Sequence, residues 1–195
     1  MQKLISMIIL FVTFSISTLA INKDQVLEKI KSKLDNFEMI QLNVEAVGSG
    51  LTGSIKAEKG NKYKMIFGDR QLVSDGKSIW NYSKPDNQVL ISKYQENSNS
   101  GIETVFFDIV NNMEAKSFSK ILNSKNGNSY KLVLKDKRNT DQIILELDEN
   151  YEIKLLEMSQ YNEVWKILKL DISKEKSDSE YNFNIPEDAE TIDMR

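Results

Sequence analysis

The chain lacks the two side chains that most often perform chemistry near neutral pH, because it contains no histidine and no cysteine. Their absence removes Ser-His-Asp and Cys-His nucleophile pairs and the usual zinc ligand sets. Acid–base catalysis would need carboxylates or lysines with shifted pKa values, since histidine alone titrates near neutrality without help. We therefore expect no enzyme, no catalytic residue, no bound metal and no cofactor.

Two pairs of adjacent carboxylates, Asp148-Glu149 and Glu187-Asp188, remain as groups that could act in acid–base catalysis. Both occupy turn-like positions, where solvated charge is expected, and nothing in the sequence fixes the separation that a catalytic pair needs. The charges of Asp75-X-Lys77 and Asp136-X-Arg138 are interpreted in the same way, as turn charges without a metal-ligand pattern.

A glycine-rich stretch, Gly48-Ser49-Gly50-Leu51-Thr52-Gly53, superficially resembles a phosphate-binding loop. It lies between two predicted strands, and no helix begins after it to bind an anion. A hairpin or bulge is the better interpretation.

Three segments have the spacing of amphipathic helices: residues 23–37, 102–113 and 115–123. In the first, Val26, Ile30, Leu34 and Phe37 share one face, and Asn22 or Asp24 could cap its start. The third segment is predicted from the closely spaced Phe118, Ile121 and Leu122.

Most of the remaining chain reads as strands separated by turn residues such as Asp75-Gly76. The predicted strands are 42–48, 50–58, 62–67, 71–74, 78–82, 88–94, 130–135, 142–147, 152–158, 163–172 and 181–185. Short connections imply antiparallel neighbours, and a twisted sheet of about eleven strands must curl. We expect a mostly β (α+β) fold in which an incomplete antiparallel barrel carries a three-helix lid over a hydrophobic cavity.

The strand predicted at 163–172 alternates imperfectly. Strict alternation places Val164, Leu168, Leu170 and Ile172 on one face and Trp165 and Ile167 on the other. Apolar residues on both faces indicate a strand that is covered twice or a surface awaiting a partner.

Residues 1–20 have the pattern of a signal peptide, with Lys3, an apolar run and a small-residue end at Ala20. The apolar run is shorter than the ~20 residues of a membrane span. We expect cleavage after Ala20 and one domain over residues 21–195. The 26 basic and 29 acidic residues are mixed along the chain and give no basic patch for nucleic acid.

The stretch 72–82 resembles the outer-membrane lipoprotein carrier family, LolA. It reads as a strand, the Asp75-Gly76 turn, and a strand with Trp80-X-Tyr82, followed by Gln88-Val89. Residues 30–35, 130–135 and 181–186 resemble, in order, the family's first helix, a later strand and the closing strand. The resemblance implies a half-barrel with a helical lid, located in the periplasm. It also implies acylated lipoproteins as cargo, an inner-membrane ABC-type releasing complex as donor and an outer-membrane acceptor.

The chain departs from the family at Lys59, which stands where family members carry an arginine implicated in holding the lid shut. Lys59 is therefore the residue expected at the lid latch, but lysine is a point charge rather than a planar fork, so the same latch geometry does not follow.

The function expected from this resemblance is burial of lipoprotein acyl chains in the cavity during transfer from inner to outer membrane, by a monomer. The side chains expected to line the cavity are Ile30, Leu34, Phe67, Trp80, Tyr82, Val89, Ile91, Phe106, Ile109, Val110, Met113, Leu132, Leu145 and Trp165. The alternatives are another lipid- or glycolipid-binding or envelope-stress-sensing module of the same architecture, and a secreted hydrolase that uses carboxylates.

Overall fold

The computed structural model describes residues 22–34, 37–94, 102, 105–121, 128–138, 140–159, 162–176 and 181–195. The signal peptide predicted at residues 1–20 lies outside these ranges. Among the described residues, neither helix has the length and apolar character needed to cross a membrane.

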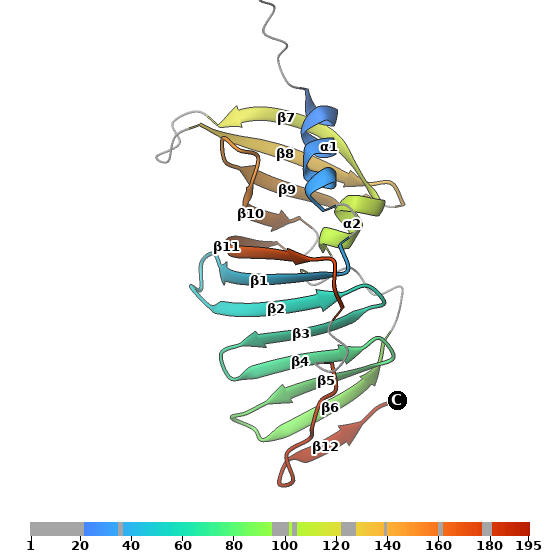
Figure 1. Cartoon of the computed structure of the whole chain (residues 1–195). Helices are drawn as coiled ribbons and strands as arrows, with labels where there is room; N and C mark the ends of the chain where they lie inside the picture. The colour runs from blue at the N-terminus through green and yellow to red at the C-terminus, as the bar shows by residue number, and fades with distance from the viewer. Residues whose placement is uncertain are drawn as a thin grey trace, which may run out of the picture.

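Two helices and twelve strands make up the described part of the chain (Figure 1). In order they are α1 (Lys23–Lys33), β1 (Met39–Ala46), β2 (Thr52–Glu58), β3 (Lys62–Phe67), β4 (Arg70–Asp75), β5 (Ser78–Ser83), β6 (Gln88–Lys93), α2 (Val105–Asn111), β7 (Met113–Ile121), β8 (Ser129–Asp136), β9 (Gln142–Leu147), β10 (Ile153–Met158), β11 (Glu163–Ser173) and β12 (Glu190–Asp193).

All the strands belong to one open sheet, in the order β12-β6-β5-β4-β3-β2-β1-β11-β10-β9-β8-β7. Figure 1 shows this sheet as a twisted column, with both helices in front of its β7–β11 part. Neighbouring strands are antiparallel except β12, which pairs in parallel with β6. The expectation of a mostly β fold with an unclosed sheet is therefore confirmed. The sheet is mixed rather than wholly antiparallel, and it has twelve strands in the described residues rather than about eleven.

The helix predicted at residues 115–123 is wrong, because residues 115–121 belong to β7; residues 122–123 lie outside the described ranges. Met113 and Ala115 are buried while Glu114 and Lys116 are exposed, which is the alternation of a half-buried strand. Pairing with β8 satisfies the backbone of β7, and a helix this short is marginal on its own. The expected three-helix lid consequently has two helices in the described residues.

The closing strand predicted at residues 181–185 is also wrong. Phe183 packs its ring against Tyr82, with centroids 5.8 Å apart, and Tyr181 is buried. This segment therefore contacts the sheet through its side chains, and the edge pairing next to β6 is made by β12 instead.

α1 begins at a capping box, in which the Asn22 side chain accepts hydrogen bonds from the N–H groups of Asp24 and Gln25. The Gln25 side chain accepts in return from the Asn22 backbone N–H. Val26, Leu27 and Ile30 face the sheet and are buried. α1 ends at Lys33, with Leu34 as its C-cap, rather than at the expected Phe37.

The two faces of the sheet carry separate apolar clusters. The face beneath the helices, hereafter the helix-covered face, is marked by Leu42, Ile55, Leu132, Leu145 and Leu156, which belong to the main core together with residues of α1 and α2. On β4–β6 a second buried set, made of Val73, Val89 and Ile91, lies outside that core. Leu72, which pairs with Met65, lies on the helix-covered face. Successive side chains of a strand point to opposite faces, so Val73 lies on the opposite face. The pairing of β4 with β5 and of β5 with β6 places Val89 and Ile91 on that same opposite face.

A β-bulge explains the imperfect alternation of β11. Asn43 pairs with Lys169, but the next residue, Val44, pairs with Ile167, so Leu168 is the extra residue. An extra residue reverses the side-chain parity on one side of it. The helix-covered face of β11 therefore holds Trp165 and Ile167 on one side of the bulge and Leu170 and Ile172 on the other, which corrects the faces expected from strict alternation.

Gly53 is the position where a side chain is least tolerable. A Cβ at Gly53 would collide with the Phe67 ring and would lie 2.7 Å from the Ile66 carbonyl oxygen. We expect Gly53→Ala to lower the free energy of unfolding by about 1–3 kcal/mol, as overpacking does, in urea denaturation of the purified protein. The double variant with Phe67→Ala should recover only part of this loss, because the backbone contact remains. Equal stability of Gly53→Ala and the parent protein would contradict this packing.

Candidate functional site

The strongest candidate site is the apolar space between the two helices and the helix-covered face. Most of the expected cavity residues meet here. Ile30, Leu34, Phe106, Ile109, Met113, Leu132 and Leu145 are buried in this core, and Phe67, Val110 and Trp165 are partly buried against it. Phe67 and Trp165 also contact each other, with ring centroids 5.3 Å apart. The arrangement brings apolar groups from both ends of the chain to one surface.

The other four expected cavity residues, Trp80, Tyr82, Val89 and Ile91, lie on the opposite face of the sheet. Trp80 pairs with Val73 and Ile91, and Tyr82 with Val89, all outside the main core. The C-terminal segment contacts this side through Phe183, which packs against Tyr82. The structure therefore does not bring these four residues to the space beneath the helices.

A cleft opens into the core beside the C-terminal half of α1. It has a volume of about 330 Å³. Its apolar lining comes from Ile30 and Leu34 of α1 and its C-cap, from Ile153 of β10, and from Ile167 and Leu170 of β11. Leu168 and Ile172 line it as well and are 48% and 38% exposed. This cleft gives solvent-side access to apolar surface.

Three lysines of α1 hold the helix on the sheet. Lys23 Nζ donates to the Ala115 carbonyl of β7 at 2.6 Å, and Lys33 Nζ donates to the Asn150 carbonyl at 3.2 Å. Between them, Lys29 Nζ lies 4.7 Å from the centroid of the Tyr151 ring. Exposed contacts of this kind contribute roughly 0–1 kcal/mol each.

An aromatic stack supports the middle of α1. Tyr151 has a φ of 61°, a left-handed conformation uncommon for an aromatic residue. Its ring stacks on Tyr130 at 5.5 Å, and Tyr130 stacks on Phe118 at 5.2 Å. The Asp148 carboxylate stabilises this tight β9–β10 connection by accepting hydrogen bonds from the N–H groups of Asn150 and Glu152. The turn thereby holds the Tyr151 ring beneath Lys29.

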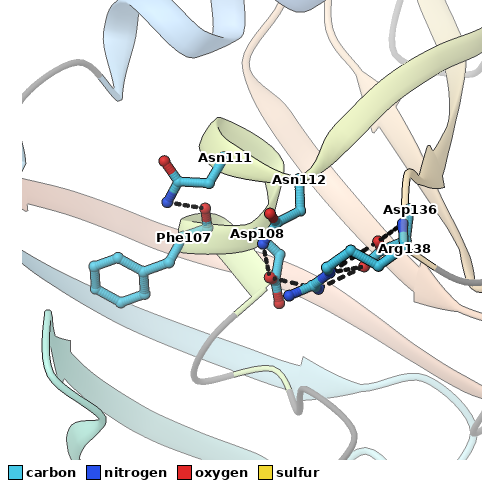
Figure 2. Close-up of polar contacts among 6 residues, drawn as sticks. All are labelled: Phe107, Asp108, Asn111, Asn112, Asp136 and Arg138. Carbon is cyan, nitrogen blue, oxygen red and sulfur yellow. Dashed lines mark hydrogen bonds and ion pairs between the residues drawn. The ribbon is translucent and has the colours of Figure 1, made fainter. Parts of the chain in front are cut away.

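α2 is held differently, by a partly buried ion-pair bridge (Figure 2). Arg138 Nη2 lies 2.6 Å from Asp136 Oδ2 at the end of β8 and 3.0 Å from Asp108 Oδ1 of α2. The two carboxylates are nearly inaccessible, at 3% and 11% exposed, while the Arg138 side chain is half-exposed. Asn112 Nδ2 donates to the same Asp108 oxygen at 2.7 Å. The bridge therefore fixes α2 to the end of β8.

The bridge also sets the protonation of its members. The hydrogen bond from the Arg138 side chain lowers the pKa of Asp136 below its ordinary value, although burial acts in the opposite direction. The same hydrogen bond raises the pKa of Arg138. Both groups are therefore charged near neutral pH.

Lys59, expected as a lid latch, lies beside Phe37 and Glu38, the two residues that precede β1. Its Nζ is 3.0 Å from Glu38 Oε1 and 6.0 Å from the centroid of the Phe37 ring. Phe37 stacks in turn on Phe107 of α2 at 4.6 Å. Among the described residues, Arg138 makes a direct polar contact to α2, although the sequence indicated it only as a turn charge. Within the described residues, no group of three His, Cys, Asp or Glu side chains could hold a metal ion.

Comparisons with known proteins identify the architecture. The model of a family described as outer membrane lipoprotein carrier protein LolA matches residues 40–184. Among curated proteins, none matches the chain. A crystal structure of an uncharacterized conserved protein from Thermus thermophilus is similar, with a TM-score of 0.52 and 14% identity over 87% of this chain and 97% of that chain. At this identity the similarity shows the fold alone. The structure of MucB in complex with MucA(peri) is more distant, with a TM-score of 0.31 and 12% identity over 83% of this chain and 60% of that chain.

Proposed function

Because the chain belongs to the LolA family of outer membrane lipoprotein carrier proteins, we propose that it binds the acyl chains of lipoproteins between its two helices and the helix-covered face. It carries them across the periplasm, from an inner-membrane ABC-type releasing complex to an outer-membrane acceptor. Residues 21–195 act as one carrier domain and a monomer, after removal of residues 1–20. Members of this family are carriers rather than enzymes and are periplasmic, which confirms the expectation of a non-enzymatic protein.

The observation that carries the proposal is an apolar core built from the faces of two short helices lying on an open sheet. Each methylene that leaves water for such a site contributes roughly 0.8 kcal/mol. In this structure Val26, Leu27 and Ile30 of α1, together with its C-cap Leu34, fill the same space and are buried. Acyl chains can therefore replace side chains without leaving a void, which would be costly.

Beyond the helices the apolar surface continues. Met65, Phe67 and Leu72 lie on the helix-covered face of β3 and β4 and are only partly buried against the core. The face therefore offers more length than α1 and α2 cover (Figure 1), as cargo with several acyl chains requires.

The proposal is tested with the protein purified from the periplasm after expression with its own leader. It is mixed with vesicles of phosphatidylethanolamine and phosphatidylglycerol that contain a purified triacylated lipoprotein, together with the purified releasing complex and ATP. We expect the lipoprotein to leave the vesicles as a complex that co-elutes with the carrier in gel filtration. The same lipoprotein with its lipidated residue replaced by serine serves as the matched control, and it should not form the complex.

Two outcomes would count against the proposal. Equal complex formation by the non-acylated control would show that the polypeptide rather than the acyl chains is recognised. Release of phospholipid without lipoprotein would favour the alternative of a general lipid carrier.

A further inference from the structure

We propose that the cleft beside α1 is the entrance of the site, where a single aliphatic tail slides between α1 and the bulged part of β11, and that α1 is the wall that moves while α2 stays in place. This inference rests on the proposed function and adds the route and the moving element.

The size and lining of the cleft fit one tail. Its volume of about 330 Å³ is at the lower end of the range of ligand sites, which is ~300–1,000 Å³. The floor consists of aliphatic side chains from α1, β10 and β11. A larger lipid with several tails needs more room, so α1 must move as further tails follow the first.

The bulge in β11 places apolar side chains at the mouth. Leu168 is the unpaired residue of the bulge and is about half-exposed, although it lines the cleft. Bulges typically re-aim one side chain at a functional position. Ile172, also accessible, continues the apolar strip along the helix-covered face toward the end of β11. A tail arriving from water can therefore contact Leu168 and Ile172 before any helix moves.

The rim of the cleft suits an oxygen-rich head group. Lys33, Lys154 and Lys169 line it, together with the single carboxylate of Glu152. Lys154 is paired with Asp148 and Glu152, and Lys169 with Asp171. The Lys33 ammonium contacts a carbonyl, that of Asn150, and can exchange this acceptor for a head-group oxygen. The occupant is therefore an acyl tail whose carbonyl or carboxylate oxygens remain at the lysines.

The two helices differ in how firmly they are held. The polar contacts of α1 come from flexible lysines, one of them at the rim itself. α2 is held by Arg138 and two nearly inaccessible carboxylates, and Asn112 alone separates it from β7. A tail that enters beside Ile30 and Leu34 replaces the contacts of α1, not those of α2.

One test replaces an accessible lining residue. We expect Leu168→Gln to weaken binding of dansyl-labelled undecanoic acid, measured by fluorescence titration, by about tenfold, the effect of losing one aliphatic contact. Ile66 offers a matched control because it is similarly exposed, at 40%, but lies on the opposite face of β3, paired with Ser54. Ile66→Gln should bind the probe as the parent protein does. If both substitutions weakened binding equally, or if Leu168→Gln had no effect on binding, the assignment of this cleft as the entrance would be overturned.

A second test locks each helix in turn, which is straightforward because the chain has no cysteine of its own. Lys33→Cys with Asn150→Cys, joined by a short bis-maleimide, ties α1 to the β9–β10 turn. Asn111→Cys with Lys137→Cys, joined in the same way, ties the end of α2 to the sequence after β8, where the Lys137 N–H bonds the Asn112 carbonyl at 3.0 Å. Treatment of each pair with N-ethylmaleimide, which blocks the cysteines without joining them, is the control.

We expect the α1 lock to slow uptake of the dansyl probe in stopped-flow measurements by about tenfold or more, and the α2 lock to leave the rate as in its control. Rapid uptake by the α1-locked protein, or slow uptake by the α2-locked one, would overturn the assignment of the moving wall and leave the carrier proposal standing. Failure of the parent protein to bind any acyl probe would instead refute the carrier proposal itself.

Discussion

Phe106→Ala should lower the free energy of unfolding by about 3–5 kcal/mol, the usual cost of removing a buried phenyl ring. Phe106 is one of the largest fully buried side chains and joins α2 to the main core. The substitution removes the contacts of the phenyl ring with buried apolar side chains and leaves a cavity where α2 meets the sheet. Urea denaturation followed by tryptophan fluorescence measures the effect.

Two further variants make this prediction specific. Ile66→Ala, on an exposed side chain of β3, should cost less than about 1 kcal/mol. Phe106→Leu should cost clearly less than Phe106→Ala, because leucine fills part of the cavity. If Phe106→Ala were as mild as Ile66→Ala, the space beneath α2 would not be closely packed.

Arg138→Ala should cost about 2 kcal/mol and should raise hydrogen exchange selectively in α2. The substitution leaves Asp136 and Asp108 without the guanidinium that pairs with both. Breaking a buried ion pair costs ~3–5 kcal/mol, and this figure is reduced here because Arg138 is half-exposed. Hydrogen exchange followed by mass spectrometry locates the change.

Arg138→Lys separates charge from geometry. Lysine keeps the positive charge but cannot bridge two carboxylates with a planar fork, so we expect an intermediate loss. Lys154→Ala, which removes a similarly exposed cation from its pairs with Asp148 and Glu152, should change α2 little. Unchanged exchange of α2 in Arg138→Ala would show that the bridge does not hold this helix.

The bridge also predicts a pH dependence. The pKa of Asp136 is lowered by the hydrogen bond from Arg138, so the stabilisation is fully present above the ordinary value of 3.8 and is lost as the pH falls through the lowered pKa. The stability difference between the parent protein and Arg138→Ala should therefore shrink in strongly acidic solution. A difference that stayed constant down to the acid transition would mean that the Asp136 carboxylate is not the group involved.

Strand pairing along the chain followed from local sequence at most positions. Turns such as Asp75-Gly76 fix tight connections, and the hydrogen bonds from the N–H groups of Lys77 and Ser78 to Asp75 Oδ1 show why this one forms. The ladders between β2 and β6 join consecutive strands. Local turn chemistry therefore sufficed to predict them.

The side of the sheet on which a residue lies was harder to predict, because alternation fixes only parity. Trp80 and Tyr82 were correctly predicted to share one face, but the register with β4 puts that face opposite the helices rather than toward the cavity. In β11 the bulge at Leu168 reverses parity within one strand. Neither the register between strands nor the position of a bulge can be predicted from the residue types alone.

Polar contacts between segments distant in the chain could not be predicted from the sequence. Asp108 and Arg138 are 30 positions apart, and Lys33 meets a carbonyl 117 positions away. As isolated charges they resemble any solvated turn or helix residue. Their roles depend on where the sheet places the ends of β8 and β9.

By itself, the sequence determined the mostly β class, most strand positions, the two helices and the lack of His- or Cys-based chemistry, because these depend on local periodicity, turn residues and composition. The tertiary structure decided which apolar face the helices cover, that residues 113–121 form a strand, where the cleft opens and what holds each helix. These properties depend on pairing register and on contacts between remote segments, which a hydrophobic pattern leaves undetermined.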